Sequence, residues 1–494
     1  MKKFFITWFV VMLPFYAFCQ SGKTCDCKKD LDFVINHLEN HYAGFQDNVT
    51  SKNKKSYQTL KKSLIEKANK NKQTPITCLA LLKEYTNFFR DNHLHAEFLQ
   101  TLQIDASSSE SVKAFKESNL FREWERIPYD STKIWQYLAK SKDPLEGIYD
   151  NANYQVAVMR SPTHWRDYYG IITQTKSPLW EKGQVKVEFK KIDAKNFLFI
   201  KHLQNYQTIV NYSESENPVP TNFDANKIFP TSSSTKPSAF NMPPEGDWFQ
   251  FKVLNDSTTY LHIKSFDPSL QSKFDSIYKQ ITPILEQKPY LIIDLRSNGG
   301  GTVSGWYPLR KYLYTRPIPK KKYDYYCSSE IIKEYEEMLV MIEKNKEAYG
   351  VEMLNAIKSV IERLKKAKLG TFVPADQPSD MNESYQAERI EPTPKKIIMM
   401  YNRESASAAE GFILEGLQSD KVLLFGENSG GFIAFGNITP AQTPSGFTLY
   451  RATSRFLDHF PYEKTGIPPH IKATNDKDWI EQTHSLWQKV GKKK

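Results

Sequence analysis

Three short, almost wholly apolar runs constrain the C-terminal half of the chain more than any other feature of its sequence. They cover residues 290–295, 396–401 and 422–425. A nearly continuous apolar run of this length is typical of a strand that is buried on both faces of a sheet. Stretches with helical spacing lie between them and before them, at 274–285 and 408–417. Strands that alternate with helices predict an α/β unit in which helices pack on a sheet.

The rest of the chain divides by its pattern. Residues 20–144 carry apolar side chains at helical spacing and predict a helical N-terminal segment. Residues 145–211 alternate between apolar and polar side chains and predict a small β-rich domain. Residues 212–245 are rich in Ser, Pro, Asn and Thr and read as a linker. The α/β core then spans 246–494, with a charged helical insertion at about 329–368.

The first nineteen residues, 1–19, have the pattern of a signal peptide. Lys2 and Lys3 precede an apolar run over 4–18, and a small residue lies at each position that a signal peptidase reads, so cleavage before Gln20 is expected. The run is shorter than the ~20 residues that a spanning helix needs. We therefore expect an exported protein, periplasmic or extracellular, without stable membrane insertion after cleavage.

Export permits disulfide bonds, because the compartments outside the cytoplasm are oxidising. Four cysteines remain in the mature chain: Cys25, Cys27, Cys78 and Cys327. A bridge from the first two to Cys78 is one pairing that fits, and the sequence leaves the pairing open. The first two are too close together for a usual metal knuckle, and no pair of histidines is spaced to complete a zinc site. No metal or cofactor is expected.

The formal net charge is +11, and loss of Lys2 and Lys3 lowers it by two to +9. The basic runs at 320–322 and 492–494 are short, far apart and not interleaved with stacking aromatic residues. They do not resemble a nucleic-acid-binding module. A basic surface that faces an anionic envelope is the better interpretation, and no nucleic-acid partner is expected.

A glycine-rich segment follows the first apolar run. Residues 294–301 read Asp-Leu-Arg-Ser-Asn-Gly-Gly-Gly. Consecutive glycines bring bare N–H groups close to whatever binds there, which suits a phosphate or an oxyanion. The segment lacks the G-x-G-x-x-G spacing of a dinucleotide site and the Gly-Lys-Ser/Thr of a phosphate-binding loop. The same glycines also fit a simple tight turn.

A serine follows the second apolar run, at the predicted junction of strand and helix. Ser407 there would expose its hydroxyl on a rigid scaffold, near the positive end of the helix. The residues from Ser407 to Glu410 also form a capping box, so on this segment alone a purely structural role is the better interpretation.

Taken together, five segments resemble the tail-specific, or C-terminal processing, serine peptidases, a family that includes the tricorn core protease. The resemblance covers about 246–475, with one element far upstream. The five segments are 91–93, 294–301, 401–410, 426–431 and 466–470. The last one ends in His470, where the family has an aspartate. The resemblance implies a crotonase-like α/β core and a protein or peptide substrate.

Members of this family differ in the residue that acts as the general base. Many members use a lysine just after the glycine-rich turn, but Phe432 occupies that place here. The tricorn-like branch uses an upstream histidine and a carboxylate near the C-terminus. By that resemblance Ser407 attacks, His93 is the general base and Glu463 helps to orient the imidazole. The nearby residues that could take over these roles are Ser405, His95, Asp458 and His459.

The resemblance also implies an oxyanion hole made by the main-chain amides of Gly300 and Ala408, with Gly299 as an alternative. The predicted reaction is hydrolysis of a peptide bond through an acyl-enzyme. Two other functions remain open: a non-catalytic ligand-binding protein on the same fold, and an esterase that uses the same site. The oligomeric state is not predicted by the sequence.

Overall fold

The computed structural model describes residues 26–491 apart from a set of gaps. The gaps are 71–74, 92, 98–103, 129, 152, 163–165, 192–195, 205, 207, 215–224, 231–247, 320–321, 345, 376–383 and 475–476. The predicted signal peptide, Cys25 and most of the predicted linker lie outside the described residues. No helix within the described part is long and apolar enough to span a membrane.

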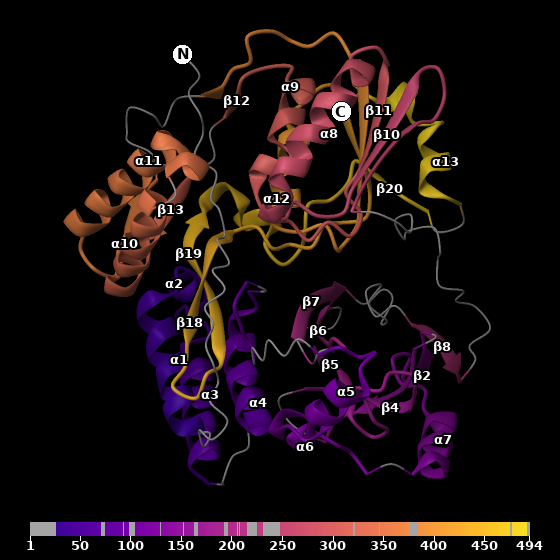
Figure 1. The fold of residues 1–494 in the computed structure, drawn as a ribbon, viewed down its shortest axis with the longest axis vertical. Coiled ribbons are helices and arrows are strands. Elements are labelled where there is room, and N and C mark those ends of the chain that lie inside the picture. The colour runs from indigo at the N-terminus through magenta and orange to yellow at the C-terminus, as the bar shows by residue number, and fades with distance from the viewer. Residues whose placement is uncertain are drawn as a thin grey trace.

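The protein is a mixed α/β molecule with several sheets (Figure 1). The core sheet has six strands, in which only the edge strand β9 is antiparallel to its neighbour. In spatial order they are β20 (Ile471–Lys472), β17 (Val422–Gly426), β16 (Lys396–Tyr401), β11 (Tyr290–Asp294), β10 (Thr258–Ile263) and β9 (Phe249–Val253). The three predicted apolar runs are therefore the central parallel strands.

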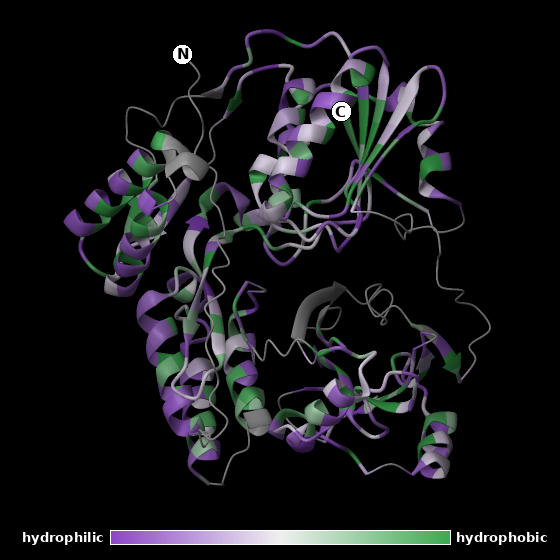
Figure 2. Ribbon diagram, viewed as in Figure 1, coloured by the Kyte–Doolittle hydropathy of each residue, from purple (hydrophilic) through white to green (hydrophobic). Residues whose placement is uncertain are grey.

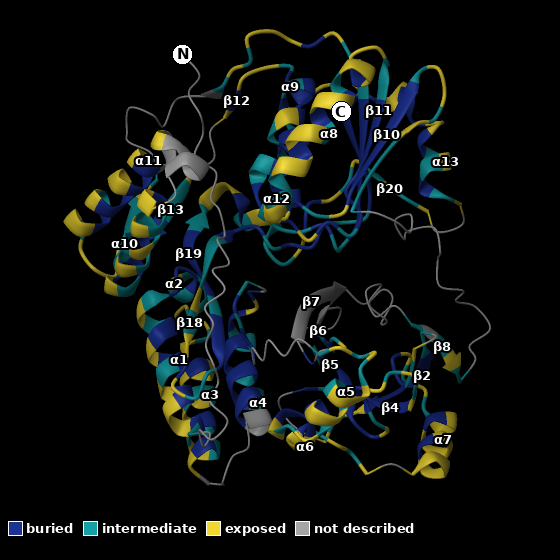
Figure 3. Cartoon of the chain, in the orientation of Figure 1, coloured by how far each residue is buried: buried dark blue, intermediate teal, exposed yellow. Residues whose placement is uncertain are grey.

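Helices cover this sheet on both faces, which explains why its central strands β11, β16 and β17 are largely apolar and buried. Leu291 and Ile293 of β11 pack in one core with helices α8 (Gln271–Leu285) and α12 (Ala408–Leu417). Ile292, between them, points to a second core, which includes helix α13 (Trp479–Thr483). The central strands are largely hydrophobic in Figure 2 and buried in Figure 3.

Parallel pairing brings the motif-bearing loops to one edge of the sheet. Asp294 at the end of β11 is in register with Met400 of β16, and Tyr401 is in register with Gly426 of β17. The segments that follow these strands thus leave the sheet at the same edge, where α/β sheets usually bind ligands.

The N-terminal segment is helical, as its periodicity predicts. Its helices are α1 (Cys27–His41), α2 (Phe45–Asn48), α3 (Lys54–Lys70) and α4 (Pro75–Thr86), followed by α5 (Ser109–Lys116), α6 (Asn119–Glu123) and α7 (Ser131–Lys140). A disulfide joins Cys27 of α1 to Cys78 of α4, whereas Cys327 is buried and free.

A seven-stranded antiparallel sheet forms the β-rich part. Its order is β7 (Thr208–Glu214), β6 (Asn196–His202), β5 (Val185–Lys191), β4 (Tyr168–Thr175), β3 (Tyr154–Arg160), β2 (Gly147–Asp150) and β8 (Asn226–Phe229). Strand β8 falls inside the predicted linker, where no strand was expected. It pairs with β2 and so belongs to this sheet.

A five-stranded sheet links the core to the N-terminal helices. Its strands are β1 (His95–Glu97), β18 (Phe435–Gln442), β19 (Thr448–Phe456), β13 (Tyr323–Tyr326) and β14 (Phe372–Pro374). The predicted helical insertion forms α10 (Ser329–Lys344) and α11 (Lys346–Lys366), which pack beside β13 (Figure 1). The buried Arg451 of β19 bonds to Glu334 of α10 at 2.7 Å.

Candidate active site

The glycine-rich loop after β11 lies directly against the turn that holds Ser407. Gly300 has a φ of +97°, and a Cβ there would lie 2.8 Å from the Cβ of Ser407 and 2.9 Å from the amide nitrogen of Ala408. Any other residue would collide with this turn. The glycine therefore serves a close approach between two backbones as well as a left-handed conformation.

Ser407 has a backbone conformation that side-chain-bearing residues rarely adopt. It is the N-cap of α12 and has φ 56° and ψ −117°. Such a conformation costs on the order of 1–3 kcal/mol and persists only where the surroundings enforce it. Here the carboxylate of Glu410 accepts the Ser407 amide at 3.0 Å, which is one half of the predicted capping box.

The neighbouring serine is part of the scaffold. Ser405 is buried, and its hydroxyl donates to the carbonyl of Leu295 at 2.8 Å. It also accepts the amide of Asn402 at 3.1 Å. The hydroxyl of Ser405 is thus used to hold the two loops together, whereas Ser407 is half-buried at the start of the helix.

Glu410 ties the serine turn to the turn after β17. This buried carboxylate accepts four hydrogen bonds, from the amide of Ser407, the hydroxyl of Ser429 and the amides of Gly431 and Phe432, at 2.6–3.0 Å. Burial nevertheless raises its pKa above the usual range. The amides of Ser407 and Phe432 bond to the same oxygen, so the two residues are close neighbours. The sequence marked Glu410 only as part of a cap.

His93 reaches the same region through strand pairing. β1 starts two residues after it and pairs antiparallel with β19. The imidazole lies edge-on to the ring of Phe432, with 6.1 Å between ring centroids. Burial lowers the pKa of His93, while the charge of Asp91 and the main chain of Phe435 oppose this shift. A neutral imidazole can act as a base. Among the described residues the ring contacts Phe432, whose amide shares a Glu410 oxygen with the Ser407 amide, and no hydrogen bond joins His93 to Ser407.

Glu463 is held by the two main-chain amides that follow Phe432 in the chain. One carboxylate oxygen accepts the amides of Ile433 and Ala434 at 3.0 and 2.7 Å. Burial, and then the charge of Asp91, raise the pKa of Glu463 to about 8. Among the described residues no hydrogen bond joins Glu463 to His93.

The alternative base and carboxylate residues have packing roles. The ring of His95 stacks on Tyr450, with centroids 4.9 Å apart. His459 contacts the carbonyl of Ile433 through Nδ1 at 3.2 Å. Asp458 accepts a main-chain amide at 3.3 Å. His470, at the family's aspartate position, likewise accepts a main-chain amide through Nδ1, at 3.0 Å.

The candidate oxyanion donors differ in availability. The amide of Gly300 donates to the side chain of Asn298 at 2.9 Å. Gly299 faces open space, since nothing beyond its chain neighbours lies within 4 Å of where a Cβ would be. Ala408 opens α12, and the first amides of a helix have no partner within it.

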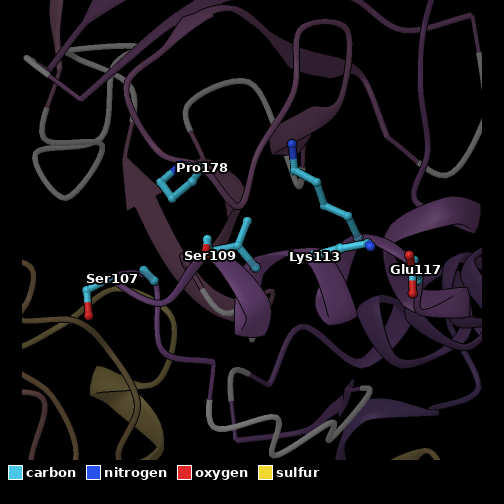
Figure 4. Close-up of a pocket in the computed structure, with 8 residues that line it drawn as sticks. Ser107, Ser109, Lys113, Glu117 and Pro178 are labelled. Carbon is cyan, nitrogen blue, oxygen red and sulfur yellow. The ribbon is translucent and has the colours of Figure 1, made fainter.

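Two further features of the described residues concern metal ligands and a surface pocket. The described residues contain no group of three or more His, Cys, Asp or Glu that could hold a metal ion. A surface pocket lies beside α5, where Lys113, Glu117 and Pro178 are among its lining residues (Figure 4). None of the predicted site residues lines it.

Comparison with known proteins gives a family and a fold. Residues 257–473 match the model of peptidase family S41. A structure of a CPAF variant has 14% identity and a TM-score of 0.50, covering 94% of this chain and 96% of that one. At this identity the likeness shows a shared fold. No curated protein matches the sequence.

Two further structures have lower scores. CPAF complexed with lactacystin has 16% identity and a TM-score of 0.46, covering 94% of this chain and 97% of that one. A putative peptidase from Parabacteroides merdae has 11% identity and a TM-score of 0.39, with the same two coverages.

Proposed function

This chain belongs to peptidase family S41 through residues 257–473 and is a serine-type peptidase, and on this premise we propose that it is exported and cleaves peptide bonds through an acyl-enzyme on Ser407. The observation that carries the proposal is the backbone of Ser407. A side-chain-bearing residue at φ 56° between a buried strand and a helix is a strained arrangement. Strain of this kind is concentrated at functional sites.

In the proposed mechanism His93 takes the proton of the Ser407 hydroxyl as the oxygen attacks the substrate carbonyl. The same imidazole then gives the proton to the leaving amine, and water hydrolyses the ester in a second, equivalent step. Burial lowers the pKa of His93, so the ring is neutral at the start of the cycle. Glu463 is the third residue of the proposed catalytic set. Its role is to hold the main chain at Ile433 and Ala434, whose amides it accepts.

The oxyanion that forms on the carbonyl needs two donors. The amide of Ala408 is one, at the positive end of α12. Gly299 is the better second donor, because the amide of Gly300 already bonds to Asn298. The close approach of Gly300 to Ser407 brings this loop to the reacting atoms. We also infer that the core sheet with α8 and α12 is crotonase-like.

Export is supported by two features. The first nineteen residues have the pattern of a signal peptide. The disulfide between Cys27 and Cys78 is typical of a protein that folds in an oxidising compartment, here periplasmic or extracellular.

The test is the cleavage of β-casein, an unstructured protein substrate, by three purified proteins. The native chain should degrade it. Ser407→Ala should abolish cleavage, because the nucleophile is gone, while its circular dichroism spectrum is unchanged. Ser405→Ala is the matched control: it should still cleave, with a loss of stability of about 1–3 kcal/mol, because both hydrogen bonds of its buried hydroxyl are missing.

The possible failures have distinct meanings. If Ser405→Ala were inactive and Ser407→Ala active, the nucleophile assignment would be wrong. A well-folded native chain without activity on casein or on nitrophenyl esters would favour a ligand-binding protein. Activity on the esters alone would favour an esterase.

A further inference from the structure

A second buried carboxylate, Asp91, lies closer to His93 than Glu463 does. It sits between the short helix Asn87–Phe89 and β1, two residues before the histidine. One oxygen accepts the hydroxyl of Tyr42 at 2.6 Å, and the other accepts the main-chain amide of His93 at 2.9 Å. Two hydrogen bonds thus fix Asp91: one comes from Tyr42, the residue that follows α1, and the other from the main chain of His93.

The same oxygen that accepts the His93 amide faces the imidazole. Oδ1 of Asp91 lies 3.9 Å from Nδ1 of His93. This nitrogen is buried and has no hydrogen-bond partner among the described residues. A buried polar atom without a partner is costly, so a small rotation of the ring that closes the gap is favourable.

Glu463 is poorly suited to the same contact. Oε2 is occupied by two main-chain amides, and burial raises the pKa of this carboxyl. Other charged groups near these carboxylates include Arg90, Lys464 and Asp47. The ammonium of Lys464 donates to Asn48 at 2.9 Å, and the side-chain amide of Asn48 in turn donates to the hydroxyl of Tyr42 at 3.4 Å.

We propose that Asp91 is a positioning residue that accepts the Nδ1 proton of His93 and so leaves Nε2 as the nitrogen that takes the proton of Ser407. The inference rests on the proposed function and deepens it. When the Ser407 proton moves to Nε2, the imidazolium carries protons on both nitrogens, and the Asp91 carboxylate stabilises its positive charge. When Nε2 gives the proton to the leaving amine, the original tautomer returns.

The test combines two readouts on the full chain. The first is a pH titration of His93 by NMR with carbon-13 at Cε1 of histidine, in which the signal is assigned by its loss in His93→Ala. The second is the rate of labelling of Ser407 by a fluorophosphonate as a function of pH.

Asp91→Asn removes one negative charge beside the imidazole while keeping the size of the side chain, so it should lower the His93 midpoint by ~1 pH unit. The plateau labelling rate should fall at least about tenfold.

Glu463→Gln is the matched control, because it makes the same chemical change at the other carboxyl. It should leave the His93 midpoint in place, since Glu463 is already protonated where His93 titrates. If Glu463→Gln moves the midpoint and Asp91→Asn does not, the proposal is wrong. A lower plateau in Asp91→Asn with an unmoved midpoint would also contradict it, because a purely structural role has that signature.

Two further outcomes keep the test decisive. If Asp91→Asn fails to fold, Tyr42→Phe takes its place: it removes the tether of the carboxylate, and an unchanged labelling rate would then contradict the proposal. If the native chain folds but is not labelled, the proposed function fails, and the NMR titration alone still decides whether Asp91 controls the tautomer and the pKa of His93.

Discussion

His93 is the residue whose protonation controls the proposed reaction. Burial lowers its pKa, so the imidazole stays neutral, and competent as a base, to a lower pH than an exposed histidine does. The value of kcat/KM should therefore rise with pH through one ionisation with a midpoint below ~6.5. His93→Ala should lose ~10²–10⁴-fold in kcat. Hydrolysis rates measured between pH 4 and 9 test both. A midpoint well above that of an exposed histidine would contradict this assignment.

Phe432 supplies the control for that experiment. It stands where related peptidases have a lysine, and its ring lies beside the imidazole. Phe432→Lys in the His93→Ala background should not restore turnover, because this half-buried position does not strip water from an amine. Restored turnover would mean that a lysine base fits the site and that the histidine is dispensable.

The sequence predicts Ser407, His93 and Glu463 from motifs, and these assignments stay predictions. It could not rank the amides of Gly299 and Gly300, because the Asn298 side chain that occupies one of them is defined only in three dimensions. Asp91 could likewise be recognised in the sequence as part of the motif at 91–93. Its hydrogen bond to Tyr42 could not be predicted, because no local sequence pattern relates the two residues.

At the scale of elements, α4 connects the disulfide to the segment that carries His93. Reducing the Cys27–Cys78 bond frees a long loop in the unfolded chain, so the free energy of unfolding should fall by about 2–4 kcal/mol. Urea denaturation with and without reductant measures this. A Cys27→Ala/Cys78→Ala variant should be equally destabilised and insensitive to reductant. A reductant effect that persists in this variant would contradict the assignment, since Cys327 is already free.

The strongly periodic elements could be predicted, and the pairings between distant ones could not. The three central strands follow from their apolar runs. Strand β8 was missed because it has only four residues, lies in a stretch rich in Ser, Pro and Asn, and shows no alternation of apolar and polar side chains. The pairing of β1 with β19 joins segments from opposite ends of the chain. A three-residue strand has too little pattern to specify its partner.

At the scale of the whole molecule, buried ion pairs hold the parts around the site in place. Lys83 of α4 lies 3.6 Å from Glu188 of β5, with both side chains buried, and joins the N-terminal helices to the seven-stranded sheet. Arg451 and Glu334 join β19 to the helical insertion. The segment bearing His93 is thus held through α4 and β1, both of which are anchored to other parts of the molecule.

The central claim is that this arrangement makes Ser407 a nucleophile. The most direct measurement is to treat the native protein with a fluorophosphonate, digest it and locate the adduct by mass spectrometry. The account predicts one modified residue, Ser407, and no labelling of Ser407→Ala or of heat-unfolded protein. An adduct on Ser405 or on another residue, or no adduct on well-folded protein, would contradict it.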